Sequence, residues 1–560
     1  MKRTLLSLLA LITPILTFAQ ENKELTFSEQ IDQTFLKYTG WFVDLIFYQI
    51  PFSDEFQIPW VLIVLIGGAL FFTIYFKFIN FTGFVTAIKV VRGKYEDIEK
   101  HGAKVLYGED GIAHTIEDLD EHTGTSQNSD LAVDGDIADT IRDESADGEV
   151  SHFQALTAAL SATVGLGNIA GVAVALSIGG PGATFWMIVA GILGMASKFA
   201  ECTLGVKYRD VGEDGTVYGG PMYYLKKGLG EKNMAGLGKV LAVLFAIFVI
   251  GGSFGGGNMF QANQAAAQFV ELAGLQGGNA GLYFGLIMAA LVAVVIIGGI
   301  KRIASVTEKI VPFMAGIYVL AALIILGVNY RHIGDAFGLI FEGAFSGLGI
   351  AGGLIGVMIQ GIRRGAFSNE AGVGSAAIAH SAVKTKYPAS EGIVALLEPF
   401  VDTVVICTMT ALVIIITNFE AGFLEYGKEV TEGVELTATA FDTVIPNFSI
   451  ILTIAVILFA FSTMISWSYY GMQGWKYLFG KGKITDLVYK ILFLIFVVVG
   501  ASISLGSVIN FSDAMIFAMV VPNIIGVILL TPKVRSELNK YNDAIKLKKD
   551  AIEDGANDLT

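Results

Sequence analysis

The chain carries a succession of apolar runs, each about 20 residues long, and these runs limit what it can fold into. One run extends from Trp60 to Phe78, and ten more follow between residues 154 and 530. A helix of about 20 residues crosses the ~30 Å hydrocarbon core of a bilayer. Because 54% of the residues are hydrophobic and only 16% are charged, a soluble fold would expose far too much apolar surface. The sequence predicts an all-α integral membrane protein with about 11 transmembrane helices.

The spacing of the apolar runs gives the expected bounds of the spans. After the first, they are Gln154–Ile178, Ala183–Tyr208, Val240–Gln264, Leu282–Ile297, Ile310–Gly327, Ala336–Phe367, Ile393–Ile416, Ser449–Tyr470, Leu487–Leu505 and Asp513–Leu530. Lys and Arg gather in alternate loops, including the one with Lys207 and Arg209, and in the tail after Thr531. Cytoplasmic loops carry this excess. We therefore expect a multi-pass protein of the inner (plasma) membrane, with a periplasmic N-terminus and a cytoplasmic C-terminus.

Two other segments differ in composition from the apolar runs. Two basic residues and a short apolar stretch precede Ala19, which is the order of a cleavable signal peptide. The stretch from Gly108 to Glu149 holds 14 acidic residues and one basic residue, so it carries −13 of the net charge of −14 and is expected to be disordered or loosely folded. The expected organisation is a signal peptide (1–19), a periplasmic N-terminus with an extra N-terminal span (20–92), an acidic cytoplasmic insert (93–150), a ten-helix transporter core (151–531) and a cytoplasmic C-terminal tail (532–560).

Glycine interrupts the second apolar run in its middle. Gly165 and Gly167 stand one residue apart, and each costs a helix about 1 kcal/mol relative to Ala. Thr163 and Asn168 flank them with side-chain oxygens. Secondary transporters break helices at the bilayer midplane, where the freed backbone groups face polar solutes and ions. Close packing through Gly167 and Gly171 is the alternative, but packing does not call for Thr and Asn at these positions.

A second glycine-rich stretch lies in the seventh run, from Ser346 to Gly353. The run Ala336–Phe367 is too long for one straight span. Because the two interrupted spans lie five spans apart, they are predicted to be the broken first and sixth core helices of two inverted five-helix repeats. Gly352 and Gly353 are accordingly expected at the substrate site. Close packing through glycine is again the alternative.

The chain resembles the alanine or glycine:cation symporter family in several long motifs, which are Ala162–Gly171, Gly179–Trp186, Gly194–Glu201, Tyr218–Pro221 and Arg364–Ala376. The likeness extends from the first span to about Leu530, whereas the signal peptide and the acidic insert depart from the usual pattern. The resemblance implies the fold of the bacterial leucine transporter. It also implies a secondary active symporter that imports a small neutral amino acid, alanine or glycine, coupled to sodium by alternating access.

The same resemblance implies roles for individual residues. The backbone amides of Leu166 and Gly167 would receive the substrate carboxylate, which suits a half-helix N-terminus that attracts anions. Thr163 and Asn168 would lie beside the substrate, with Gly165 in the break. Sodium would take an all-oxygen shell from the carbonyls of Ser161, Val164 and Phe459 and the hydroxyls of Ser462 and Thr463. For these two hydroxyls, ordinary hydrogen bonding between helices is the alternative.

Three further polar residues within the apolar runs are substrate-site candidates. Asn258 and Gln261 can share one helix face and could line the pocket. Gln360, in the seventh run, could also line the pocket. Polar groups at this depth must find partners, so hydrogen bonding between helices is an almost equal alternative for all three.

Acidic residues within the membrane would allow proton coupling. Glu398 and Asp402 lie four residues apart and could bind protons, or they could pair with Arg363 or Arg364. The same two arginines have Asn369 and Glu370 as loop neighbours, for which a gating salt bridge is expected.

The sequence does not suggest an enzyme. His152, His380 and the other histidines sit in or near expected loops, so no nucleophile with a base, and no set of metal ligands, lies at matching depth. Sodium is the expected coupling ion, without an organic cofactor. The expected partners are a small amino acid and the lipid bilayer, and nothing points to nucleic acid. A proton-coupled amino acid symporter and a transporter-like nutrient sensor are the alternatives.

Overall fold

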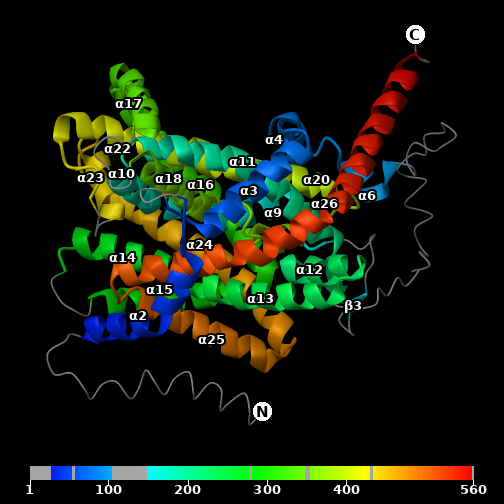
Figure 1. The fold of residues 1–560 in the computed structure, drawn as a ribbon, viewed down its shortest axis with the longest axis horizontal. Coiled ribbons are helices and arrows are strands. Elements are labelled where there is room, and N and C mark those ends of the chain that lie inside the picture. Colours follow the sequence, from blue (N-terminus) through cyan, green and yellow to red (C-terminus); the bar gives the residue numbers. More distant parts are fainter. Residues whose placement is uncertain are drawn as a thin grey trace.

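The computed structural model is mostly helical and describes residues 27–52, 57–103, 140–141, 148–212, 215–275, 280–346, 353–428 and 433–557. The predicted signal peptide, almost all of the acidic insert and Gly352 lie outside the described residues. Figure 1 shows the helices packed side by side in one bundle.

An N-terminal arm, residues 27–103, precedes the core and packs against it (Figure 1). Its helices are α2 (Phe27–Ile46), α3 (Trp60–Tyr75), α4 (Ile79–Thr82), α5 (Phe84–Val91) and α6 (Glu96–His101). Two short antiparallel strands, β1 (Gln49–Pro51) and β2 (Gln57–Pro59), pair Ile50 with Ile58. The apolar helix α3 contacts both α11 and α26 of the core.

The core begins at Ser151, whose side chain caps the first helix. Up to the sixth span its elements are α9 (His152–Thr163), η3 (Gly167–Gly171), α10 (Val172–Gly179), α11 (Gly182–Lys207), α12 (Pro221–Gly230), α13 (Ala235–Phe254), η4 (Gly255–Met259), α14 (Phe260–Leu272), α15 (Ala280–Ile296) and α16 (Gly299–Val328). A small antiparallel sheet joins β3 (Thr140–Ile141), β4 (Asp210–Gly212) and β5 (Val217–Tyr218).

The remaining elements complete the bundle. They are η5 (Tyr330–His332), α17 (Ile333–Ser346), α18 (Gly353–Asn369), α19 (Ala376–His380), α20 (Pro388–Ala395), α21 (Leu397–Pro399), η6 (Phe400–Cys407), α22 (Thr408–Ala421), α23 (Val434–Asp442), α24 (Phe448–Phe479), α25 (Lys483–Gly500) and α26 (Leu505–Asn557). The segments η3, η4 and η6 are π-helical, and such local widenings of a helix occur frequently at functional sites.

Six helical stretches among the described residues are long and apolar enough to cross a membrane, and the bent pair α9–α10 makes a seventh. Two shorter apolar helices, α3 and α15, add to these. The protein is therefore a multi-pass membrane protein. The count of about eleven spans and their arrangement as inverted repeats stay predictions.

The predicted seventh span, Ala336–Phe367, contains two helices. Helix α17 ends at Ser346 and α18 begins at Gly353, and residues 347–352 between them lie outside the described part. Figure 1 shows α17 projecting from the bundle. Helix α18 ends at Asn369, and a non-helical segment follows it up to Ser375.

Helix α11 forms the centre of the bundle. Every residue from Gly194 to Val206 is buried, and the helix contacts α18, α19, α20 and η6. Small residues permit this close packing, because a Cβ atom on Gly194 would stand 2.6 Å from the methyl group of Ala371. Helix α26 continues to Asn557, well beyond the predicted end of the last span at Leu530, so no helix boundary separates the core from the tail.

Candidate functional site

The glycine pair in the second apolar run breaks the helix where the sequence predicts. Helix α9 ends at Thr163, the next three residues are not helical, and η3 begins at Gly167. The helices on the two sides are bent by 51°. Gly165 is required by close approach, since a Cβ atom at this position would stand 2.5 Å from Thr463 Oγ1. The break therefore packs directly against α24.

Asn168 holds the break in shape from within. Its Oδ1 accepts the N–H of Gly165 at 2.9 Å, while its Nδ2 donates to Asp402 Oδ1 at 2.7 Å. The other oxygen of Asp402 accepts the hydroxyls of Ser368 at 2.8 Å and Thr403 at 2.7 Å. Asp402 is fully buried and belongs to η6, so it ties η6 to η3 and to α18. The predicted pairing of Asp402 with an arginine is wrong, because these neutral donors surround it.

A second unwound segment packs against the first. It extends from Glu370 to Ser375, where φ is +55° at Glu370, +81° at Gly372 and +92° at Gly374. Glycine adopts such left-handed conformations without steric cost, which explains the two glycines. A Cβ atom on Gly167 would stand 3.3 Å from Ser368 Cα, just before this segment. The prediction of a break at residues 346–353 therefore missed the segment that faces the first break.

A small polar cavity lies between the two unwound segments and α24. Its lining residues come from seven elements and from the non-helical segment after α18: Ala162, Thr163, Gly167, Gly256, Gln261, Phe367, Glu370, Trp467 and Ile516. Glu370 accepts hydrogen bonds from Trp467 Nε1 at 3.0 Å and from the Ser375 hydroxyl. Gln261 Oε1 accepts the N–H of Leu166 at 3.4 Å. The cavity thus brings together backbone freed by the break, a carboxylate, an amide and three bulky apolar side chains.

The structure brings only some of the predicted substrate residues to this cavity. Thr163, Gly167 and Gln261 line it. Gly165, Leu166 and Asn168 do not, although the Leu166 N–H bonds to the lining residue Gln261. Asn258 instead donates to the carbonyl of Phe493 at 2.7 Å, which is the alternative reading of a bond between helices. Gly353 and Gln360 do not line it either, because Gly353 starts α18 and Gln360 packs beside Gly179 at the far end of α10.

Sequence reasoning missed Phe367, Glu370 and Trp467 as lining residues. Glu370 was expected in a salt bridge with Arg363 or Arg364, but both arginines pair with Asp513 on α26, Arg363 Nε at 2.9 Å. One signal could have identified the segment: Gly372 and Gly374 repeat the spacing of Gly165 and Gly167.

A cluster of oxygen atoms joins α9 and α24 beside the first break. The Thr463 hydroxyl donates to the carbonyl of Ser161 at 2.9 Å, and the Ser161 hydroxyl donates to the carbonyl of Ser462 at 2.8 Å. The Ser462 hydroxyl donates to the carbonyl of Phe459 at 3.0 Å. Four of the five residues predicted to bind sodium are therefore linked by hydrogen bonds. Val164, the fifth, directly follows Thr163 at the end of α9.

His152 and His380 lie at helix ends beside loops, as the sequence indicates. His380 is fully buried at the end of α19, and His152 is the first residue of α9. Glu398 accepts from Lys198 at 2.9 Å and contacts His380, so it does not pair with Arg363 or Arg364. Cys202 lies near His380 and Glu398 in a grouping that could hold a metal ion. The adjacent Lys198 ammonium argues against a cation there.

Comparison with known proteins decides the family. The model of the sodium:alanine symporter family matches residues 131–554. The chain belongs to the sodium:alanine symporter family. It is 46% identical over 406 residues to the sodium/alanine symporter AgcS of Methanococcus maripaludis, which covers 72% of this chain and 87% of that protein. The protein is thus a transporter and not an enzyme.

Two further relatives differ from AgcS in the substrate or the coupling ion that their names give. The probable sodium/glutamine symporter GlnT of Bacillus subtilis is 35% identical over 405 residues, covering 72% of this chain and 81% of that protein. The putative sodium/proton-dependent alanine carrier protein YrbD of the same organism is 35% identical over 429 residues, covering 75% and 86%. Among solved structures, MhsT in complex with L-phenylalanine has a TM-score of 0.51 at 14% identity, covering 72% of this chain and 97% of that chain. This last likeness shows the fold alone.

Proposed function

We propose that the protein imports a small neutral amino acid, alanine or glycine, together with sodium by alternating access. The observation that carries the proposal is the cavity where the unwound segment after Thr163 meets the unwound segment at Glu370. Backbone groups freed from helical pairing at membrane depth can bind a zwitterion that hydrocarbon would otherwise exclude.

The cavity offers a complementary group for each part of an amino acid. The amides of Leu166 and Gly167, at the start of η3, would receive the carboxylate, and the Leu166 N–H would exchange its bond to Gln261 for one to the substrate. The Glu370 carboxylate can accept the ammonium group from the opposite wall. Phe367, Trp467 and Ile516 would enclose the side chain, and bulky walls favour a small one.

Sodium fits the oxygen cluster between α9 and α24. It is a hard cation, which is suited by carbonyl and hydroxyl oxygens, and the cluster contains only such atoms. We propose that the carbonyls of Ser161, Val164 and Phe459 and the hydroxyls of Ser462 and Thr463 bind it. Because Thr463 also touches Gly165, an ion here would stabilise the break that forms the substrate site. Binding of the ion and binding of the substrate would therefore be coupled through the contact between Thr463 and Gly165.

The uptake of alanine into proteoliposomes tests this function. We expect accumulation of radiolabelled alanine driven by an inward sodium gradient, and no accumulation when choline replaces sodium. Competition by unlabelled glycine and glutamine separates the small substrates from a larger one. Uptake that is unchanged in choline would contradict sodium coupling.

Proton coupling is the second candidate, because Glu370 and Asp402 are buried carboxylates at or beside the site. A pH gradient imposed without sodium discriminates it: uptake under this condition favours protons as the coupling ion. Alanine binding without any flux would instead favour a transporter-like nutrient sensor. In each case we place the protein in the inner membrane, with the C-terminus in the cytoplasm.

A further inference from the structure

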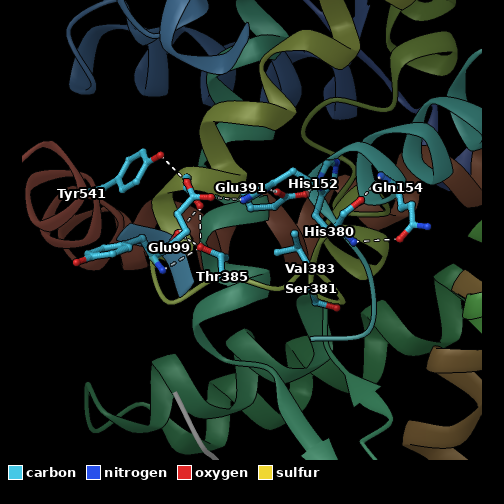
Figure 2. A network of polar contacts seen from close by, with 12 residues as sticks. Glu99, His152, Gln154, His380, Ser381, Val383, Thr385, Glu391 and Tyr541 are labelled. Carbon is cyan, nitrogen blue, oxygen red and sulfur yellow. Dashed lines mark hydrogen bonds and ion pairs between the residues drawn. The ribbon is translucent and has the colours of Figure 1, made fainter. Parts of the chain in front are cut away.

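Helix α9 is held differently at its two ends. At its C-terminal end, the non-helical residues 164–166 separate it from η3 and α10, with a bend of 51°. A few non-helical residues that include glycine can absorb the φ and ψ changes of a hinge. At its N-terminal end, His152 is clasped by two carboxylates from two other elements (Figure 2). A short rigid helix with a hinge at one end and a clasp at the other has the form of a gate.

The clasp uses both ring nitrogens of His152. Nε2 lies 2.7 Å from Glu99 Oε2, on α6 of the N-terminal arm, and Nδ1 contacts Glu391 Oε2, on α20. Ionised carboxylates can only accept hydrogen bonds, so a ring between two of them carries both protons and a positive charge. The His152 side chain is 12% exposed, and those of Glu99 and Glu391 are 4% and 0% exposed. The contact is therefore largely removed from water, where ion pairs are screened least.

The carboxylates of the clasp are themselves anchored. The second oxygen of Glu391 contacts His380, His380 contacts Glu398, and Glu398 accepts from Lys198 on α11. On the other side, Glu99 accepts the hydroxyl of Tyr541, on α26, at 2.6 Å. Figure 2 shows Tyr541, Glu99, Glu391, His152 and His380 arranged in one row.

Acids and bases alternate along this chain, and their charges balance. Glu99, Glu391 and Glu398 offset the cationic forms of His152, His380 and Lys198. Among the described residues, His152 is the single member that belongs to α9. The other members lie on α6, α11, α19, α20, α21 and α26, so the clasp joins the N-terminal end of α9 to these elements. The backbone just before α9 is tied as well, because the N–H of Val150 donates to the carbonyl of Ala382 and its carbonyl accepts the N–H of Lys384.

We propose that His152 is a latch that, together with the backbone bonds of Val150, holds the N-terminal end of α9 closed against the core during loading of the substrate site. Breaking its contacts with Glu99 and Glu391 lets α9 turn about residues 164–166 and opens the cavity toward this end of the molecule. Lys and Arg distribution predicts that this end is cytoplasmic. His152 thereby acts as a positioning residue for transport, and this reading rests on the proposed function.

Hydrogen–deuterium exchange of the purified full-length protein, without substrate or sodium, tests the latch directly. In H152Q we expect backbone exchange in residues 153–163 to rise roughly tenfold, because amide exchange reports local opening. Exchange in residues 449–461 of α24 should stay at the wild-type rate. The matched control is H332Q, the same substitution at an exposed histidine whose carboxylate partner Asp335 is also exposed. H152R, with a guanidinium that can donate to both carboxylates, should restore slow exchange.

A second variant covers the case in which H152Q does not fold. E99Q removes one side of the clasp and leaves the His380, Glu398 and Lys198 contacts in place. Its control is E96Q on the same helix, since Glu96 forms an exposed pair with Lys100. Unchanged exchange in residues 153–163 in both variants would overturn the proposal. An equal rise in α24 would also overturn it, since that result marks general loosening.

Transport kinetics give a second readout that general loosening would not produce. If the latched state falls to about a third of the molecules, the alanine concentration for half-maximal uptake rises about threefold. The exchange result is independent of which solute is carried. A protein that shows latch-dependent exchange but no sodium-driven alanine uptake would therefore refute the proposed function and leave the latch standing.

Discussion

Gly165 and Thr463 approach so closely that a methyl group does not fit between them. A Cβ atom on Gly165 would also stand 3.4 Å from Gln261 Oε1, a group that lines the cavity. Gly171, at the other end of η3, has open space around the same position. Substitutions at Gly165 and Gly171 therefore distinguish the effect of crowding at the site from the effect of replacing a glycine in this segment.

Gly165→Ala should abolish alanine uptake. Overpacking of this kind costs about 1–3 kcal/mol, and the displaced Thr463 hydroxyl is a proposed sodium ligand. Gly171→Ala is the control: its φ of −62° suits alanine, so uptake should be retained and stability should be equal or about 0.5 kcal/mol higher. Proteoliposome uptake and thermal unfolding in detergent measure both effects. Full activity of Gly165→Ala would contradict the site.

Removing the hydroxyls of the oxygen cluster should weaken sodium binding. A hydrogen-bonding or ion-contacting group that faces a charge contributes about 1.5–3 kcal/mol, so Thr463→Val should raise the sodium concentration for half-maximal uptake by roughly tenfold or more. Ser462→Ala should act in the same direction. Ser468→Ala is the control on the same helix, since that hydroxyl bonds within its own helix to Ile465. A sodium response equal to wild type in Thr463→Val would remove Thr463 from the ion site.

At the scale of elements, the site is made where α9–η3 and α18–α19 both lose helical pairing. The first break was predictable, because Gly165 and Gly167 stand among polar residues within an apolar run. The segment from Glu370 to Ser375 was not predicted, because the glycines before Gly353 are more numerous than those at Gly372 and Gly374 and drew the prediction to residues 346–353. Two glycines one residue apart, next to Glu370, were a better indicator of the unwound backbone at the cavity than the number of glycines.

Long-range pairing accounts for the other differences between prediction and structure. Glu398 lies 200 residues from Lys198, and Asp402 lies 234 residues from Asn168. Neither partner can be read from local pattern, since only the packing of α11 against α21 and of η3 against η6 brings these groups together. The oxygen cluster at Ser161 and Thr463 was reached through a family resemblance rather than from the residues alone.

Asp402→Asn tests the brace between η3 and η6. The substitution replaces an acceptor of three hydrogen bonds by an amide that must turn one N–H₂ group toward existing donors. We expect a stability loss of about 1–3 kcal/mol and weaker alanine binding. Asp335→Asn, at an exposed aspartate on α17, is the matched control. Thermal unfolding and equilibrium binding measure the two effects, and unchanged values in Asp402→Asn would show that the brace does not shape the site.

At the scale of the whole molecule, the N-terminal arm and the long helix α26 meet at one end of the core. Tyr541 bonds Glu99 there, and Lys548 pairs with Asp97. Basic residues are concentrated in the same region, including Lys533, Arg535 and Lys540. Charge distribution therefore predicts that this end faces the cytoplasm.

Reporter fusions test the orientation. Green fluorescent protein attached after Thr560 should fluoresce, because it folds in the cytoplasm. Alkaline phosphatase inserted after Asn329, between α16 and η5, should be active, since it requires the periplasm. The opposite pattern in both fusions would invert the proposed topology and place the latch on the outer side.

The central claim is that sodium and a zwitterion bind at one break in the membrane. Equilibrium binding of radiolabelled alanine to the purified protein, in sodium and in choline, measures this most directly. The account predicts saturable binding in sodium that unlabelled glycine displaces, and loss of that binding in choline. Equal alanine binding in the two salts, or none in either, would contradict it.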